Sequence, residues 1–250
     1  MMTNESELLA QIRDLQAQLA SAQAEQWKLI RLVCHELRLP LSSIKGYNDL
    51  MPLTGPINDQ QKDFVARIKK NVGRMTSMIT NLHELAYMGE GRFSLKPAPV
   101  SPAEAIEKVC REMQPLASER GNTLTASVPD PVPDVQADRE RLDQVLRILV
   151  ENALMYTPGG GQVTVTAGPP DEGLVQITVA DTGIGVAETE RDQLFTLFFR
   201  GDVPLVRDQL GAGMNLYMLR RFVEYMGGAY GAEFPAKGGS RFWVRLPTAN

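Results

Sequence analysis

The chain has 250 residues, a hydrophobic fraction of 43% and a formal net charge of −4. This length allows two modest domains with cores of their own, and the lack of a basic run argues against nucleic-acid binding. No apolar stretch reaches the roughly 20 residues that a membrane span needs. Cys34 and Cys110 lack the spacing of metal ligands, as expected for reduced thiols in the cytoplasm.

Residues 5–26 are expected to form a polar helix with one apolar seam. The seam residues recur at alternating steps of four and three positions: Leu8, Ile12, Leu15, Leu19 and Ala22. This spacing is typical of a coiled coil, so residues 1–26 are predicted to be a short coiled-coil helix. The seam then resumes at Trp27, one residue out of phase, and such a break requires a local change in supercoil winding.

Later in this helix a histidine is followed directly by a carboxylate, as His35 and Glu36. Apolar residues recur around them at three- and four-residue steps and are expected to form one buried stripe: Ile30, Cys34, Leu37, Leu41 and Ile44. An imidazole beside a carboxylate can lose its proton and attack phosphorus. His35 is therefore a candidate nucleophile, with Glu36 accepting its proton or orienting its ring. The other histidine, His83, matches no motif and is interpreted as structural or as a surface residue.

A second helix is predicted after a break at Pro52, Gly55 and Pro56, with Asn58 and Asp59 as caps. One of its faces is apolar: Phe64, Ile68, Met75, Met78, Ile79, Leu82 and Leu85. Residues 27–90 are thus predicted to form an antiparallel hairpin whose two stripes cannot both be buried within one chain. Pairing two hairpins across a two-fold axis into a four-helix bundle buries them, which predicts a homodimer.

The second half of the chain alternates between helical and β-rich patterns. Residues 91–100, with Pro97 and Pro99, are predicted to be a linker, and residues 101–250 a second domain. The predicted helices and strands cover residues 102–120, 123–128, 138–156, 162–167, 174–180 and 242–246. This order predicts a two-layer α/β sandwich with helices on one face of a mixed sheet, and the α+β class for the whole chain.

Two segments of this half carry residues that suit a nucleotide. Asn152, late in a helix, offers a neutral amide oxygen for the Mg²⁺ that accompanies a triphosphate. Asp181, at the end of a strand, can accept a hydrogen bond from the exocyclic amine of adenine. Gly183 and Gly185 follow at once and let the backbone approach a ligand closely.

A third such segment contains Gly211 and Gly213 and precedes another predicted helix, whose first N–H groups could bind phosphate. Between residues 185 and 211 the pattern is irregular and rich in charge. A long irregular stretch in a compact domain is usually functional, and this one is interpreted as a lid over the nucleotide. Its three phenylalanines have the alternative interpretation of core packing: Phe195, Phe198 and Phe199.

Taken in order, these segments resemble the sensor histidine kinases of two-component signalling, over roughly residues 25–250. Six segments are similar to the phosphoacceptor box, the asparagine box, the first glycine box, the phenylalanine box, the second glycine box and the closing strand of that family: residues 35–40, 149–158, 181–185, 194–202, 211–216 and 238–247.

The resemblance implies an ATP-dependent protein-histidine kinase that autophosphorylates His35 and passes the phosphoryl group to an aspartate of a separate response regulator. An upstream sensory domain or a partner protein would supply the signal. The break at Trp27 then has two interpretations. It is either a junction that carries the signal or an ordinary linker helix that only dimerises.

The resemblance also implies site residues. Adenine is expected near Asp181 and Tyr156, Mg²⁺ on Asn152, and Arg200 close to the developing phosphate charge. The residues expected around ATP are Asn152, Tyr156, Asp181, Gly183, Gly185, Gly211, Gly213 and Leu216.

Four positions depart from the family pattern. Leu39 replaces a Thr or Asn that would orient water, which counts against phosphatase activity. Ile148 replaces a second Asn, Met155 a Lys that would contact phosphate, and Asn215 the last glycine of its box. Two functions therefore remain open, an active autokinase or a degenerate dimeric scaffold that binds nucleotide or partners with little turnover.

Overall fold

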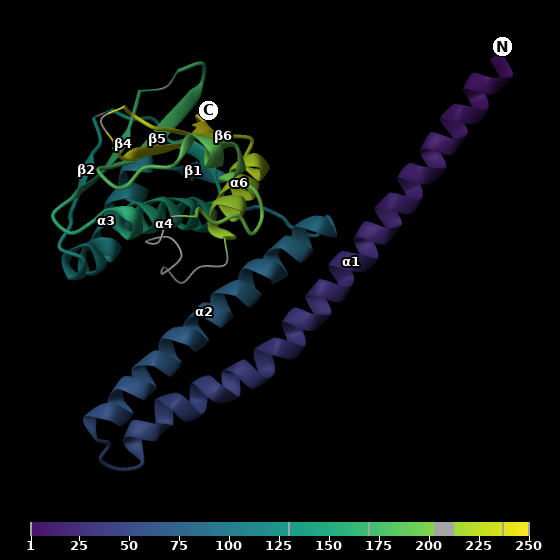
Figure 1. Cartoon of the computed structure of the whole chain (residues 1–250). Coiled ribbons are helices and arrows are strands. Elements are labelled where there is room, and N and C mark those ends of the chain that lie inside the picture. Colours follow the sequence, from purple (N-terminus) through teal and green to yellow (C-terminus); the bar gives the residue numbers. More distant parts are fainter. Residues whose placement is uncertain (1, 130, 170, 203–212, 237, 250) are drawn as a thin grey trace. The chain divides into compact units, whose positions relative to one another are not determined.

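The computed structural model describes residues 2–129, 131–169, 171–202, 213–236 and 238–249. The chain folds into two compact units, Met1–Ser94 and Leu95–Asn250. The first unit is a helical hairpin, and the second combines helices with a sheet (Figure 1). The predicted fold class is therefore confirmed.

The hairpin consists of α1 (Met2–Leu50), the short 3-10 helix η1 (Met51–Leu53) and α2 (Asp59–Gly89). α1 continues without interruption through Trp27, so the change of seam phase there is not a break in the helix. Across the described residues, the helices lack any span with the length and apolarity that a bilayer crossing requires.

The start of α2 is fixed by Asn58, one of the two predicted caps, which forms a capping box with Gln61. Asn58 Oδ1 accepts from the Gln61 backbone N–H over 2.9 Å, and Gln61 Oε1 accepts from the Asn58 backbone N–H over 2.8 Å. These reciprocal bonds satisfy backbone donors that the first helical turn leaves without partners. At the other end the helix stops before Gly91, whose φ of +67° belongs to the left-handed region.

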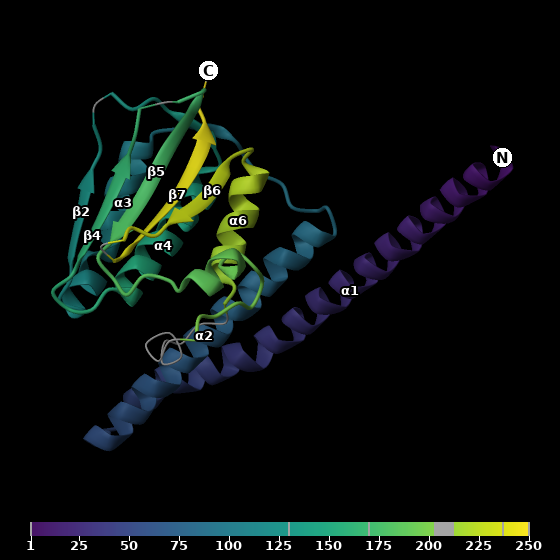
Figure 2. The ribbon, with the colours of Figure 1, turned by 45° about the horizontal axis from the view of Figure 1, so that its top comes forward.

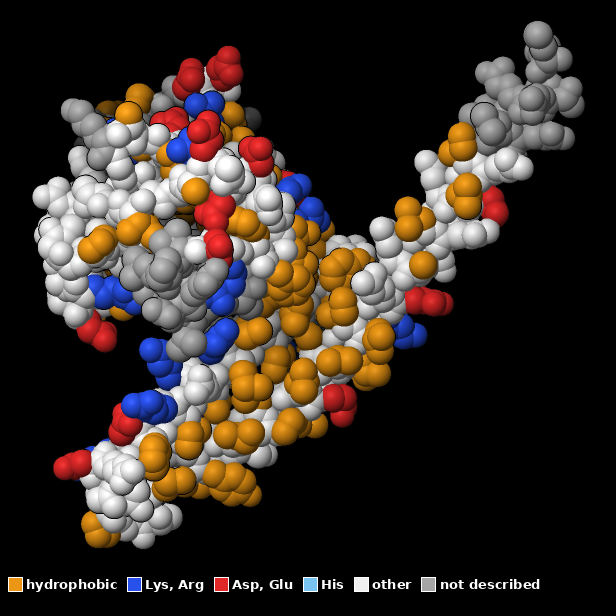
Figure 3. All heavy atoms as spheres, in the orientation of Figure 1, with side chains coloured by type: hydrophobic (Ala, Val, Ile, Leu, Met, Phe, Trp, Pro, Cys, Tyr) orange, Lys and Arg blue, Asp and Glu red, His pale blue; other side chains and the backbone are white. Residues whose placement is uncertain are grey.

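The core of the hairpin is thin. Cys34, Leu41, Val72 and Ile79 are buried, with Ile30 and Leu82 packed against them. The prediction of one buried stripe on α1 is wrong for two members in the single chain, because Leu37 is 46% and Ile44 is 47% exposed. Two helices meet along one line and leave the flanks of both stripes uncovered. Figure 3 shows apolar side chains along this hairpin, and the exposed ones include Leu37, Ile44, Phe64, Ile68 and Met75.

Two side-chain contacts fix how α1 and α2 align. Near the turn, Asn48 Nδ2 donates to the Val65 carbonyl oxygen over 3.2 Å. Near the open end, Arg31 Nε lies 3.0 Å from Glu90 Oε1, and the Glu90 side chain is only 12% exposed. The segment of α1 just before His35 is therefore tied to the point where the chain leaves the hairpin.

The second unit contains a five-stranded sheet of order β2-β4-β5-β7-β6. Its strands are β2 (Thr123–Ser127), β4 (Gln162–Ala167), β5 (Leu174–Asp181), β6 (Ala229–Glu233) and β7 (Ser240–Pro247). β2 and β4 are parallel and the other neighbours antiparallel, so the sheet is mixed, as predicted. Figure 2 shows three helices on one of its faces: α3 (Pro102–Glu119), α4 (Arg139–Tyr156) and α6 (Asn215–Tyr225).

Three strands were not predicted. β1 (Ala98–Val100), inside the segment predicted to be a linker, pairs antiparallel with β3 (Val135–Ala137), and β6 forms an edge of the main sheet. β1 and β3 have three residues each, too few to show an alternating pattern, and β6 is rich in Ala and Gly. Their pairing is set by segments distant in sequence, which local propensity does not report.

The core of this unit lies between α4 and the sheet. α4 buries eight aliphatic side chains along its length: Leu142, Val145, Leu146, Ile148, Leu149, Val150, Ala153 and Leu154. β4 and β5 alternate buried and half-exposed positions beneath it. This packing fixes the C-terminal end of α4 close to the end of β5, where the predicted nucleotide residues lie.

Candidate functional site

Asp181, the last residue of β5, begins a tight turn at the rim of the sheet. Its Oδ1 accepts hydrogen bonds from the backbone N–H groups of Gly183, over 2.8 Å, and Ser240, over 3.2 Å. Burial raises the pKa of this carboxyl group, and the backbone donors partly oppose that rise. The carboxylate is therefore held in place by the protein itself, before any ligand is bound.

Glycines allow three backbone segments to meet around this carboxylate. Gly185 and Gly239 have φ values of +69° and +78°, which favour glycine. A Cβ added at Gly183 would overlap the carbonyl oxygen of Tyr156, and one added at Gly239 would overlap that of Asp181. The turn after β5, the end of α4 and the turn before β7 are thus in contact through their backbones.

Hydrogen bonds join this turn to the C-terminal end of α4. The Ile184 N–H donates to the Tyr156 carbonyl oxygen over 3.1 Å. The buried Asn122 holds the same end, because its Nδ2 donates to the Thr157 carbonyl oxygen over 3.0 Å and its Oδ1 accepts from the Gly161 N–H over 3.2 Å. Asn122 was not predicted as a site residue, since one asparagine before a strand has no distinctive pattern.

The last turns of α4 present polar groups to this region. Asn152 and Tyr156 are half-buried and lie one turn apart, so they share a side of the helix. Burial raises the pKa of the Tyr156 phenol, and Arg200 is close enough to oppose the rise. Burial also raises the pKa of Glu151. Asp181 and Tyr156 are thus two titratable groups with raised pKa values where the end of α4 meets the end of β5, a pairing typical of functional sites.

Three of the four positions that depart from the family pattern lie on or near α4, whereas Leu39 lies on α1 and is exposed. Ile148 is buried and Met155 is half-buried. The Met155 carbonyl oxygen accepts from Arg120 Nη1 over 3.4 Å. A guanidinium group is therefore bound to the backbone of the residue whose side chain lacks the family's positive charge. Asn215 is the first residue of α6 and is exposed.

The irregular segment that follows the first glycine turn contributes partly to the core. It includes the 3-10 helix η2 (Glu188–Gln193). The Phe195 ring packs against those of Tyr230 and Phe242, with centroids 4.7 Å and 6.3 Å apart, so core packing is correct for this phenylalanine. Phe198 is instead 56% exposed and has a φ of +65°, an unusual conformation for a residue with a side chain.

Gly213 joins this segment to the start of α6. Its φ is +68°, and an added Cβ would overlap the Phe199 carbonyl oxygen. α6 begins two residues later, and no described side chain caps its first turn. The predicted phenylalanine and second glycine boxes therefore pack against each other, and a helix N-terminus follows them directly.

Leu216 lies in the first turn of α6 and is half-buried. Gly211, together with the rest of residues 203–212, lies outside the described residues. Of the predicted nucleotide residues, the structure brings one group into direct contact around the end of β5: Tyr156, Asp181, Gly183 and Gly185.

In the hairpin unit, His35 lies on an exposed side of α1. Its Nδ1 is 3.2 Å from Glu36 Oε1, and the two side chains are 64% and 66% exposed. A carboxylate only accepts hydrogen bonds, so this contact requires the hydrogen on Nδ1 and leaves the lone pair on Nε2. The structure thus presents an accessible imidazole nitrogen that can act as a nucleophile.

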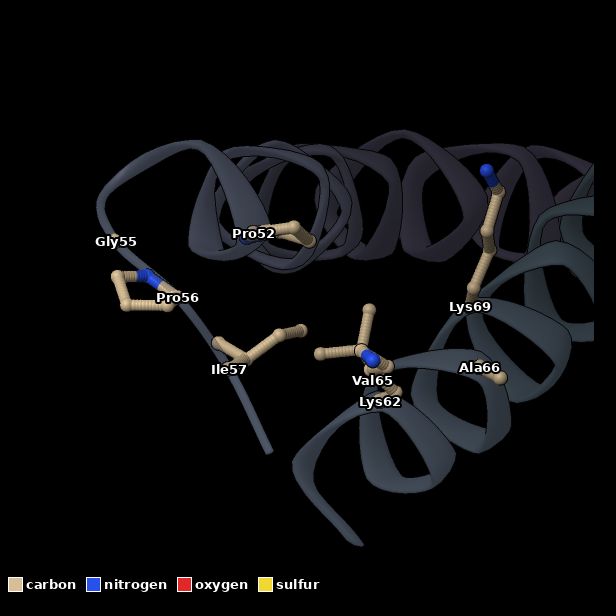
Figure 4. Close-up of a pocket in the computed structure, with 8 residues that line it drawn as sticks. All are labelled: Pro52, Gly55, Pro56, Ile57, Lys62, Val65, Ala66 and Lys69. Carbon is tan, nitrogen blue, oxygen red and sulfur yellow. The ribbon is translucent and has the colours of Figure 1, made fainter. Parts of the chain in front are cut away.

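An open pocket of about 640 Å³ lies at the turn of the hairpin (Figure 4). Its walls come from η1, the loop after it and the first turns of α2: Pro52, Gly55, Pro56, Ile57, Lys62, Val65, Ala66 and Lys69. Lys62 Nζ lies 2.9 Å from Asp59 Oδ1. The lining contains no carboxylate and none of the residues predicted to bind nucleotide.

Two family models match the chain. Residues 26–91 match the His Kinase A (phospho-acceptor) domain. Residues 137–250 match the histidine kinase-, DNA gyrase B- and HSP90-like ATPase. The first range contains His35 and the second contains the Asp181 turn.

Curated relatives agree with these models. The chain is 33% identical over 215 residues to the histidine protein kinase DivJ of Caulobacter vibrioides, an alignment that covers 85% of this chain and 36% of that protein. It is 32% identical over 215 residues to the signal transduction histidine-protein kinase BaeS of Escherichia coli, covering 86% of this chain and 45% of that protein. The chain thus spans less than half the length of these relatives.

Among solved structures, full-length ShkA in complex with AMPPNP is similar to this chain with a TM-score of 0.76 and 30% sequence identity. The similarity covers 89% of this chain and 46% of that one. It extends across both units, as does the match to the curated relatives.

Truncating Asn122 and Asn152 to alanine separates a residue that stabilises the site from one that is expected to contact the ligand. Asn122→Ala should destabilise the second unit by about 1–3 kcal/mol, because a buried carbonyl and N–H lose their partner. Asn152→Ala should leave stability nearly unchanged and weaken the binding of Mg-ATP. Thermal unfolding and titration calorimetry on both variants test this. Equal losses of stability would contradict the distinction.

Asp181→Asn should preserve or raise stability at pH 7 while lowering ATP affinity. Burial raises the folded-state pKa of Asp181, so the protonated form contributes stability below the unfolded-state pKa that is lost as pH rises through the folded-state value. Asparagine keeps an acceptor oxygen and removes the buried charge. The prediction is tested by urea unfolding at pH values from below the unfolded-state pKa of Asp181 to neutral pH, together with ATP titrations. A variant that is less stable than the parent at neutral pH contradicts it.

Proposed function

Because the chain belongs to the histidine kinases of two-component signalling, we propose that it transfers the γ-phosphoryl group of ATP to His35 and then to an aspartate of a response regulator. One observation carries the proposal. The same chain holds an accessible imidazole with Nδ1 bound to a carboxylate and, in its other unit, a fixed Asp181 carboxylate surrounded by glycine turns.

In the proposed reaction His35 Nε2 is the nucleophile. Its lone pair attacks the γ-phosphorus, the bond between that phosphorus and the oxygen bridging to the β-phosphate breaks, and ADP leaves with the bonding electrons. Glu36 accepts from Nδ1 over 3.2 Å, so it holds the productive tautomer and takes the Nδ1 proton as the ring gains charge. Because both side chains are well exposed, this contact orients the ring more than it stabilises the fold.

ATP is proposed to bind at the end of β5. The Asp181 carboxylate accepts a hydrogen bond from the adenine amine, and Tyr156 lines the same region from α4. The amide oxygen of Asn152 fits a magnesium site, because Mg²⁺ usually takes one or two protein oxygens and completes its shell with phosphate oxygens and water. When bound there, Mg²⁺ would offset the charge of the triphosphate.

The phosphates are proposed to lie near the start of α6. Gly213 lets the backbone approach the phosphates, and the first N–H groups of α6 can donate hydrogen bonds to them. The charge of Arg200 lowers the pKa of Tyr156, which supports a position near the end of α4. Arg200 is proposed to stabilise the charge that develops on the transferred group.

The hairpin is proposed to form a homodimer. Its exposed apolar side chains can be buried against another apolar surface, and a second hairpin related by a two-fold axis supplies one. The proposed setting is the cytoplasm, where ATP is available. A response regulator is the proposed phosphoryl acceptor, and an upstream sensory domain or partner protein the source of the signal.

A second candidate is a dimeric scaffold that binds nucleotide or partners with little turnover. It is favoured by the apolar face that Ile148 and Met155 give to α4, and by Asn215 at the start of α6. The retained His35 and Glu36 contact favours the kinase over the scaffold, because a scaffold needs no exposed nucleophile with a fixed tautomer.

His35→Gln should abolish labelling by [γ-³²P]ATP while the affinity for ATP stays within a few-fold, since the two sites lie in separate units. Label on the parent protein should be lost in acid and retained in alkali, the behaviour of a phosphoramidate bond. A folded His35→Gln protein that still incorporates label would rule out His35 as the acceptor.

Met155→Lys should tighten ATP binding or speed autophosphorylation by roughly ten- to a hundredfold. A charge-assisted contact with phosphate is typically worth about 1.5–3 kcal/mol, at about 1.4 kcal/mol per factor of ten. Met155→Gln has a similar length without the charge and should show little gain. ATP titrations and labelling rates of the pair test this. Weaker binding by the lysine variant would mean that another cation already supplies this charge. The first candidates are Arg200 and Arg207, of which Arg207 lies outside the described residues.

A further inference from the structure

The hairpin places the second histidine of the chain at the level of the first. The hydrogen bond of Asn48 near the turn and the ion pair of Arg31 near the open end fix the alignment of α1 with α2. Counting from these two contacts, at about 1.5 Å per residue in each helix, brings His83 to within about one helical turn of the level of His35.

The hydrophobic core of the hairpin gives the same alignment. Cys34, which precedes His35, and Leu82, which precedes His83, pack in one cluster between the helices. The His83 ring is half-buried and lies edge-on to the Tyr87 ring, with centroids 4.7 Å apart. The two histidines thus flank the same part of the core, one from each helix.

Positive charges surround His83 from the facing helix. Arg31 and Arg38 lie one turn before and one turn after His35, so the three side chains share a side of α1. Burial is the main cause that lowers the pKa of His83. The charges of Arg38 and Arg31 lower this pKa further, and His35 adds a smaller lowering effect, whereas Glu84 raises it. At neutral pH these neighbours favour the uncharged ring.

We propose that His83 is the charge-compensating residue of the phosphoacceptor site: its ring takes up a proton when His35 is phosphorylated and balances part of the new negative charge. The inference rests on the proposed function in that His35 is the acceptor. A phosphoryl group brings negative charge and three acceptor oxygens to a place where burial, and after it Arg38 and Arg31, lower the pKa of His83. His83 acts by charge on the product state and is a positioning residue, not the nucleophile.

Protons balance in this scheme. The N–P bond forms at His35 Nε2 as the bond to the ADP oxygen breaks, and the Nδ1 proton passes to Glu36 or water. The lone pair of the neutral His83 ring then takes a proton from solvent. Below the pKa of His83 in the unphosphorylated protein the ring is charged in both states, and above its pKa in the phosphorylated protein it is charged in neither. Proton uptake is confined to the window between those two values, and phosphorylation is favoured as pH falls through it.

The chain has two histidines, which makes a direct test possible. In His35→Asp a permanent negative charge replaces the imidazole, and His35→Asn is its neutral counterpart of the same shape. Each variant keeps His83 as its single histidine, so the ring protons can be titrated by NMR without assignment. The pKa of His83 should be higher in the Asp variant, by about half to one pH unit. Equal values in the two variants would overturn the proposal.

The functional consequence is tested with His83→Gln. At a fixed ratio of ATP to ADP, the phosphorylated fraction of the parent protein and of this variant is measured between pH 5.5 and 9. The phosphorylation equilibrium constant of the parent, divided by that of His83→Gln, should rise by up to about tenfold as pH falls. One pH unit of change in the pKa of His83 corresponds to a factor of ten. A structural role alone would lower the stability of the variant without changing this ratio with pH. A flat ratio across the range overturns the proposal.

Failure of this inference can be told from failure of the proposed function. If ATP does not label the parent protein, the kinase assignment fails, but the Asp and Asn variants still report on His83. Phosphoramidate, a small chemical donor of phosphoryl groups, provides a further route to a modified His35 without ATP. If ATP labels His35 and the pKa of His83 does not change on labelling, the kinase assignment stands and the inference about His83 is wrong.

Discussion

The candidate nucleotide site depends on the way the Asp181 carboxylate is held at the end of β5. Two backbone N–H groups bind the same oxygen, and they come from the turn after β5 and from the start of β7. Both turns can approach only because glycine stands where a side chain would overlap a carbonyl group. A buried charge at this position is unfavourable for folding. The Asp181 carboxylate is therefore better explained by a role in ligand binding than by a contribution to stability.

The two units divide the chemistry between them. The hairpin carries the exposed His35 imidazole with its Nδ1 beside the Glu36 carboxylate, and the sandwich carries the fixed Asp181 carboxylate and the glycine turns. Neither half needs the other for its local geometry, since the hydrogen bonds described for each lie within one unit. Catalysis in such a protein is largely a question of bringing two prepared surfaces together at the right moment.

The sequence was informative wherever a local pattern has one physical solution. The capping residue Asn58, the strand at residues 162–167 and the turn at Asp181 follow from local chemistry, and each occurs as predicted. Asn122 and the short strands β1 and β3 depend on partners distant in sequence, so no window of residues reports them. Burial of the hairpin stripe was overestimated for a related reason: periodicity identifies an apolar face but does not say which molecule covers it.

The same reasoning clarifies the junction at Trp27. The indole packs on Gly89, where an added Cβ would overlap the ring, and Arg31 pairs with Glu90 one residue farther along. Arg92 also pairs with Glu90, over 3.2 Å. The seam therefore changes phase beside the residues through which the chain leaves the hairpin. A rotation or shift of α1 at this level has to move Gly89 and Glu90 or break their contacts. The interpretation as a signalling junction stays a prediction, but these contacts give it a physical route that an isolated linker helix would lack.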